Sequence, residues 1–123
     1  MPRPVKYRKV CCLPENNLFG PLGEGSYTKE PIELTIEEYE TIRLIDLQGL
    51  TQEECAASMQ IARTTVQKIY NDARKKIAES LVDARQLIIA GGNYRLFNDQ
   101  ERRKCCCKCR RNKMCKYYQD HGE

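Results

Sequence analysis

Residues 51–76 decide the fold, and they read TQEECAASMQIARTTVQKIYNDARKK. Thr51 is followed three residues later by Glu54, which is the spacing of a capping box, so a helix is predicted from there to about Met59. A second helix is predicted over residues 63–82, because apolar residues recur there at intervals of three and four. Its buried stripe is expected to contain Val66, Ile69, Ala73, Ile77 and Leu81. The stretch therefore predicts two helices joined by a tight turn.

The turn between these helices has the composition of a helix-turn-helix motif. Ala56 offers a small side chain where the two helices would touch, and Cys55 is expected in the core beside it. Gln60 occupies the turn position that often holds Gly, and Ala62 occupies the position of the usual Ser or Thr cap. Without that cap, backbone N–H groups are left that can bind a phosphate. An ordinary three-helix bundle is the alternative interpretation.

A helix is also predicted before this pair, over about residues 36–48. Apolar residues recur at helical spacing, Thr35 can form a capping box with Glu38, and Gly49 ends the run. This helix is acidic, with Glu33, Glu37, Glu38, Glu40 and Asp46. DNA would repel such a surface, so the helix is expected to face away from a duplex or to meet a protein partner.

Two β-prone runs follow the long helix. Residues 86–90 and 94–97 flank the turn sequence Gly91-Gly92-Asn93, which predicts a hairpin or an edge strand. A two-stranded ribbon is marginal alone, so pairing is expected with residues 6–13 or with another chain. Strand pairing between chains would be one route to a homodimer. A loop packed against the helices is the alternative.

The exposed face of the predicted helix 63–82 carries polar and basic side chains suited to DNA. Arg63 could pair with guanine and Gln67 with adenine, while hydroxyl groups could contact phosphate or a thymine methyl. The basic residues of the later turns, including Lys76, are better placed for backbone phosphates. The predicted DNA-binding residues are Arg63, Thr64, Thr65, Gln67, Lys68, Asn71, Arg74 and Lys75. A solvated helix face is the alternative for each of them.

Charge is distributed unevenly along the 123 residues. Residues 1–10 and 99–123 together carry twelve basic and four acidic side chains, whereas residues 11–98 carry nine basic and thirteen acidic ones. Basic ends are typical of proteins that bind a polyanion, although they also occur as solubilising tails. The predicted organisation is a basic, Pro- and Gly-rich arm over 1–32, a helical domain with a trailing β segment over 33–98, and a basic Cys-rich tail over 99–123.

Five of the eight cysteines lie in the tail, at Cys105, Cys106, Cys107, Cys109 and Cys115. Thiols clustered among Lys and Arg suit zinc or another thiophilic metal, such as Cu(I) or an iron–sulfur cluster. The spacing is not the paired C-x-x-C of a zinc ribbon, so a disordered basic tail is an equal alternative. Cys11 and Cys12 could complete a metal site if the two ends meet, and the lone His121 adds little.

The sequence resembles two known protein families. Residues 34–77 resemble region four of sigma-70-type factors, which reads promoter DNA. Nearly the whole chain resembles uncharacterised protein family 0251 (domain of unknown function 134) through MPRPVKYRKVCCLP, EEYETIRLIDLQGLTQEECAASMQIARTTVQKIYNDARKKIAESL and LIIAGG. These resemblances imply a mainly α fold, namely a three-helix, sigma-70 region-four-like helix-turn-helix with a short β segment or hairpin and extended N- and C-terminal arms. They also imply a DNA-binding protein.

The expected function is therefore sequence-specific binding of double-stranded DNA by a transcriptional regulator, with residues 63–82 in the major groove. The alternative is a protein-interaction module that contacts the transcription machinery and carries a metal- or redox-sensing Cys-rich tail. Catalysis is not expected, because neither a Gly-rich phosphate loop nor a nucleophile beside a base is visible. A cytoplasmic protein is expected, since neither a secretory signal nor a membrane span is apparent.

Overall fold

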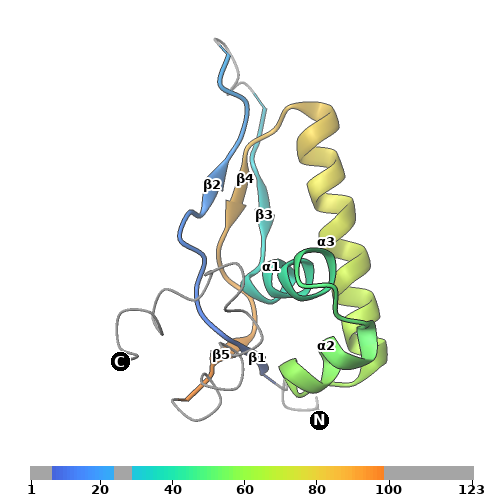
Figure 1. Ribbon diagram of the computed structural model, residues 1–123. Helices are drawn as coiled ribbons and strands as arrows, with labels where there is room; N and C mark the ends of the chain where they lie inside the picture. Colours follow the sequence, from blue (N-terminus) through green and yellow to red (C-terminus); the bar gives the residue numbers. More distant parts are fainter. Residues whose placement is uncertain (1–6, 24–28, 99–123) are drawn as a thin grey trace, which may run out of the picture.

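A computed structural model describes residues 7–23 and 29–98 of the chain. Its helical elements are α1 (Ile36–Thr41), the π-helix η1 (Ile42–Leu47), α2 (Gln52–Met59) and α3 (Arg63–Asp83). Its strands are β1 (Arg8–Val10), β2 (Leu18–Phe19), β3 (Ile32–Leu34), β4 (Leu87–Ile89) and β5 (Tyr94–Leu96). Figure 1 shows the long α3 running beside the sheet of β2, β4 and β3, with α2 and the pair β1–β5 at the other end. The protein is a small helical domain with two small sheets.

The first predicted helix is present and changes its winding midway. Thr35 caps it as predicted, because its Oγ1 accepts the Glu38 N–H at 3.2 Å while Glu38 Oε1 accepts the Thr35 N–H at 2.9 Å. After α1 the backbone continues as η1, and the Gln48 N–H donates to the Arg43 carbonyl, five residues earlier, at 2.9 Å. Sequence periodicity predicted one regular helix here and did not reveal the wider turns.

The next two helices lie where residues 51–83 predicted them. Thr51 and Glu54 form the predicted capping box, with bonds of 3.1 and 2.9 Å. The chain then reverses at Gln60, which has the left-handed φ of 58° that Gly would favour. Ala62 stands at the N-cap of α3 and makes no side-chain cap, as predicted.

Both predicted strands exist, but they form no hairpin with each other, and of the two alternatives the edge strand holds for β5. β4 lies in the middle of the first sheet, parallel to β3 and antiparallel to β2, whereas β5 pairs in parallel with β1. Gly91 and Gly92 have positive φ, and the Gly91 carbonyl and the Asn93 N–H bond to the start of α1 instead of forming a hairpin turn. The chain consequently leaves one sheet and joins the other. The pairing of the second run with residues 6–13 is confirmed.

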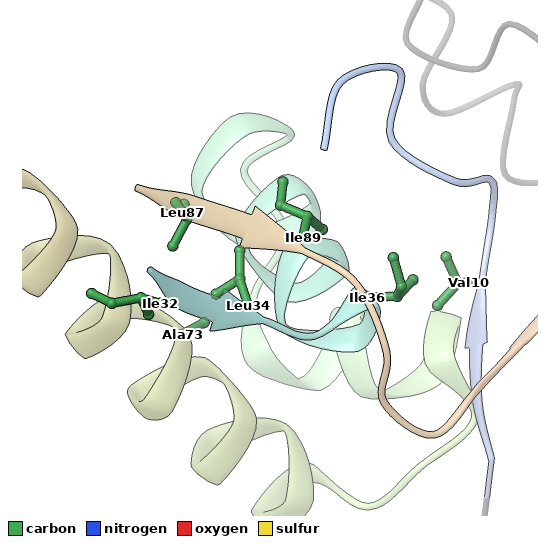
Figure 2. Packing of buried hydrophobic residues seen from close by; sticks show 7 residues of the cluster. All are labelled: Val10, Ile32, Leu34, Ile36, Ala73, Leu87 and Ile89. Carbon is green, nitrogen blue, oxygen red and sulfur yellow. The ribbon is translucent and has the colours of Figure 1, made fainter. Parts of the chain in front are cut away.

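Buried apolar side chains form two clusters. The sheet-side core joins the strands to α1 and α3 and consists of Val10, Ile32, Leu34, Ile36, Ala73, Leu87 and Ile89. Figure 2 shows the side chains of β3 and β4 gathered near Ala73 of α3, with Val10 and Ile36 beside each other. The helix-side core joins η1, α2 and α3 and consists of Leu44, Cys55, Ala56, Met59, Ile61, Val66 and Ile69.

The observed core differs from the predicted one at the end of α3 and at the N-terminal arm. The buried stripe of α3 ends early, because Ile77 is only partly buried and the Leu81 side chain is 81% exposed. Within the predicted N-terminal arm, Val10 and Cys11 are fully buried. β1 packs against α1 and α2, so this stretch is part of the domain's packing.

Candidate nucleic-acid interface

The predicted DNA-binding residues occupy the surface of α3 that faces away from the core. Seven of the eight are exposed, and Thr65 is partly buried. Val66 and Ile69 point inward and keep only 0% and 8% of their surface exposed. The spacing of a regular α-helix places Thr64, Gln67, Lys68, Asn71 and Lys75 within one exposed sector. The structure thus brings five of the eight predicted residues together on one polar and basic face.

The start of α3 adds backbone donors to this face. Helix α3 begins at Arg63 with Ala62 as its N-cap, and that cap provides no side-chain acceptor. The first N–H groups of a helix carry partial positive charge and have no partner within the helix. An anion at this end of α3 would be stabilised by these donors together with the Arg63 guanidinium.

Two of the lysines on α3 form ion pairs of different kinds. Lys68 Nζ lies 3.0 Å from Asp72 Oδ2, but both side chains are largely exposed, so this pair can open at little cost. Lys76 Nζ lies 2.8 Å from Glu38 Oε1, and the Glu38 side chain is only 9% exposed. Lys76 therefore ties α3 to the start of α1. The expectation that it is placed for backbone phosphates, like Arg74 and Lys75, is corrected.

Tyr70 contributes to this surface and was missed in the sequence. Its hydroxyl donates to Asp46 Oδ1 at 2.7 Å, which raises the pKa of the Tyr70 hydroxyl. The guanidinium of Arg74 lies over the Tyr70 ring, 5.3 Å from its centroid. Residues four apart on a helix are neighbours, so the contact between Tyr70 and Arg74 was accessible from spacing. The contact between Tyr70 and Asp46 depends on the winding of η1, so it was not accessible from spacing.

The acidic surface predicted for the first helix is mostly absent, because its glutamates serve the fold. Glu37 accepts the Asn93 N–H at 3.0 and 3.2 Å, and Glu38 caps α1 and pairs with Lys76. Glu40 is fully buried and accepts two bonds from Arg43, at 2.9 and 2.8 Å, as well as one from the Cys11 N–H at 3.2 Å. Glu33 and Asp46 remain exposed.

Some cysteines lie within the residues that the structure describes, and others lie outside them. Cys105, Cys106, Cys107, Cys109 and Cys115 lie outside the described residues, and so does His121. In the described part of the chain, no three His, Cys, Asp or Glu side chains are grouped so as to hold a metal ion. Cys55 is a core residue, as predicted: burial, together with the negative charge of Glu40, raises the pKa of its thiol to about 12.

Comparison with known proteins gives a family and no solved structure. The family model described as "Protein of unknown function DUF134" matches residues 1–97. A UPF0251 protein of Desulfitobacterium hafniense is 64% identical over 96 residues, which is 78% of this chain and 77% of that protein. A UPF0251 protein of Caldicellulosiruptor bescii is 51% identical over 94 residues, covering 76% of this chain and 65% of the relative.

A third relative, from Thermoanaerobacter sp. strain X514, is also a UPF0251 protein and is 44% identical over 102 residues, which is 83% of this chain and 90% of the relative. No solved structure matches the chain. Within residues 7–23 and 29–98, no helix has both the length and the apolar character that crossing a bilayer requires. The extent of the family match shows that the chain belongs to the DUF134 family.

Proposed function

We propose that this protein binds double-stranded DNA sequence-specifically and acts as a transcriptional regulator. In this proposal α2 and α3 form a helix-turn-helix of the sigma-70 region-four kind, and α3 enters the major groove. The observation that carries the proposal is the exposed first half of α3, where Arg63, Thr64, Gln67, Lys68 and Asn71 present polar groups without an exposed apolar side chain among them.

The packing supports a rigid presentation of this face. Ala56 of α2 is 6% exposed and belongs to the same buried cluster as Val66 and Ile69 of α3. These contacts leave the opposite side of α3 open for its first three turns. A helix held in this way can enter a groove about 12 Å wide without rearranging its own core.

The side chains divide by the contacts that they can make. Arg63 and Gln67 have the paired donors, or donor and acceptor, that read guanine and adenine edges. The hydroxyl and methyl groups of Thr64 and Thr65 suit phosphate oxygens or a thymine methyl, and the Asn71 amide can donate to a phosphate. Lys75 and the ring-stacked Arg74 lie farther along α3, where they would meet phosphates as α3 leaves the groove.

The first test is the salt dependence of binding to a duplex. Binding through phosphates predicts a linear decrease of log affinity with log salt concentration, and Lys75→Ala should reduce that slope by about one unit for every sequence. Arg95→Ala is the matched control, because it removes one positive charge from β5, which lies away from α3 in Figure 1. Affinity that is negligible for any duplex at low salt would contradict the proposal.

The alternative function, a protein-interaction module, makes the opposite prediction for the same titration. It requires an acidic contact surface on the first helix, and three of the five acids predicted for that surface are buried. The proposal of DNA binding is therefore preferred, because the surface that it requires is exposed.

A further inference from the structure

A second surface, at the far end of α3, is apolar and largely exposed, and it adjoins the sheet-side core only through the partly buried Ile77. The Leu81 and Val82 side chains near the end of α3 are 81% and 79% exposed. A groove of about 350 Å³ lies between this end of α3 and the loop after β2. Its apolar lining is formed by Phe19, Pro21, Ile77, Leu81 and Ala84, which we call the apolar groove.

The exposure of these side chains calls for a partner. A 21-residue helix whose stripe ended with the core could carry polar residues in its last turns at no cost to the fold. Here Leu81 and Val82 follow one another in that position, and Phe19 on the neighbouring edge strand is half-exposed. A contiguous exposed apolar surface on a small domain is typical of an interaction site.

Charges beside the apolar groove indicate which partner fits. A second hollow, which shares Arg85 with the groove, is lined by Lys29, Glu30, Asp83 and Arg85, which we call the charged rim. Lys29 Nζ donates to the Asp83 backbone carbonyl at 2.6 Å, and Arg85 Nε donates to the Glu30 backbone carbonyl at 2.8 Å. Both bonds use backbone acceptors, and among the described residues neither rim carboxylate has an ion-pair partner.

A rim with two positive and two negative side chains is complementary to itself. When two copies meet about a twofold axis, each patch faces an identical patch, so balanced charges can pair across the axis. The exposed first half of α3 is less suited to this, because its basic residues Arg63, Lys68, Arg74 and Lys75 outnumber its one acid, Asp72. Self-complementarity therefore favours a second copy of this chain over a strongly charged partner.

The position of the groove keeps it clear of the proposed DNA-binding face. Leu81 is 18 residues after Arg63 on one helix, which corresponds to about 27 Å along the axis. Figure 1 shows the end of α3 at the opposite end of the molecule from α2. Contact through the groove would leave the first turns of both α3 helices accessible.

We infer that the apolar groove and the charged rim form the interface of a twofold-symmetric homodimer. Leu81 and Phe19 are buried against their counterparts, and rim carboxylates of one copy meet rim cations of the other. This route differs from the pairing expected for residues 86–90, because β4 already has a strand on each side. The inference does not depend on DNA binding, and its test contains no DNA.

The first experiment is sedimentation equilibrium of the full chain under reducing conditions, from micromolar to millimolar concentration. The wild type should associate reversibly from 14.3 kDa to twice that mass. Leu81→Glu should raise the dissociation constant by about tenfold or more, because it places a charge in an apolar contact. Leu47→Glu is the matched control, since Leu47 is 56% exposed and lies on η1. This variant should associate like the wild type.

Two rim variants test the proposed pairing directly. Lys29→Glu with Arg85→Glu makes the rim entirely acidic, and Glu30→Lys with Asp83→Lys makes it entirely basic. Each variant should be monomeric alone, and an equimolar mixture should form the heterodimer. Circular dichroism of each variant must match the wild type, because Lys29 and Arg85 also bond the backbone.

A wild type that stays monomeric at every concentration would overturn the inference. So would a dimer that Leu81→Glu leaves intact, a dimer that Leu47→Glu weakens equally, or folded rim variants that fail to associate when mixed.

Discussion

The two cores of this domain are built from different kinds of contact. The helix-side core draws all of its members from residues 44–69, so each contact joins segments close in the sequence. The sheet-side core joins Val10, near one end of the described chain, to Ile89, near the other. Contacts between neighbouring helices follow from hydrophobic spacing, whereas contacts between distant strands depend on how the whole chain is routed. The two cores therefore differ in what a sequence can reveal about them.

The largest expected effect is in the helix-side core. Ala56→Glu places an unpaired carboxylate where the side chain is 6% exposed and packed against α3. Burying such a charge costs more than a small domain can tolerate, so the variant should be largely unfolded at 25 °C. Thermal melting, monitored by circular dichroism, measures the unfolded fraction at 25 °C.

Ala57→Glu is the matched control for that experiment, because Ala57 is the next residue of α2 and is exposed. It should melt close to the wild type. If the two variants melted alike, Ala56 would not lie at the contact between α2 and α3.

The difference between the cores also explains which parts of the fold could be predicted. Capping boxes at Thr35 and Thr51 and the apolar spacing of residues 63–73 are local signals, and they predicted three helices at nearly their observed bounds. β2 has two residues and β3 has three, too few for a period to be recognised. Apart from the pairing of β5 with β1, the sheet topology was inaccessible, because it depends on where the chain turns at Gly91 and Gly92.

A somewhat smaller effect is expected at the buried Glu40–Arg43 ion pair, which belongs to neither apolar cluster. Glu40→Gln removes the charge that Arg43 pairs with, while Arg43 remains 5% exposed. Removing one partner of a buried ion pair destabilises proteins by about 3–5 kcal/mol. Chemical denaturation should show this loss, and Glu53→Gln, which alters an exposed acid of α2, should change stability by less than about 0.5 kcal/mol. A loss of similar size in both variants would show that the buried Glu40–Arg43 pair contributes no more to stability than an exposed acid does.

The smallest predicted effect concerns pH and the helix-side core alone. The pKa of the Cys55 thiol is raised from 9.0 to about 12, chiefly by burial, so the folded state holds its proton more tightly than the unfolded state does. The resulting stabilisation is complete below pH 9 and is lost as pH rises from 9 toward 12, at about 1 kcal/mol per pH unit.

The measurement is the free energy of unfolding between pH 8 and pH 10.5, compared with that of Cys55→Ala. The variant loses some packing at every pH, but its stability should decrease less steeply above pH 9. Parallel curves for the two proteins would show that the Cys55 thiol is not the group that titrates.

The site was predictable to the same extent as the local structure. The eight predicted DNA-binding residues between Arg63 and Lys75 were assigned to the exposed face of α3, because they alternate with the buried Val66, Ile69 and Ala73. The partners of these side chains come from elsewhere in the chain, as with Lys76 and Glu38 or Tyr70 and Asp46, and no spacing rule relates them. Sequence thus predicted the candidate surface but not the contacts that tie α3 to α1 and η1.

The measurement that tests the central claim most directly is selection of bound duplexes from a random pool, followed by affinities for the selected and random sequences. The account predicts an enriched sequence. It also predicts that Arg63→Ala or Gln67→Ala loses about 1–3 kcal/mol of preference at individual base pairs, while Lys75→Ala weakens binding to all sequences alike. A pool without enrichment, or equal losses on selected and random DNA for both Arg63→Ala and Gln67→Ala, would contradict the assignment of α3 as the element that reads DNA.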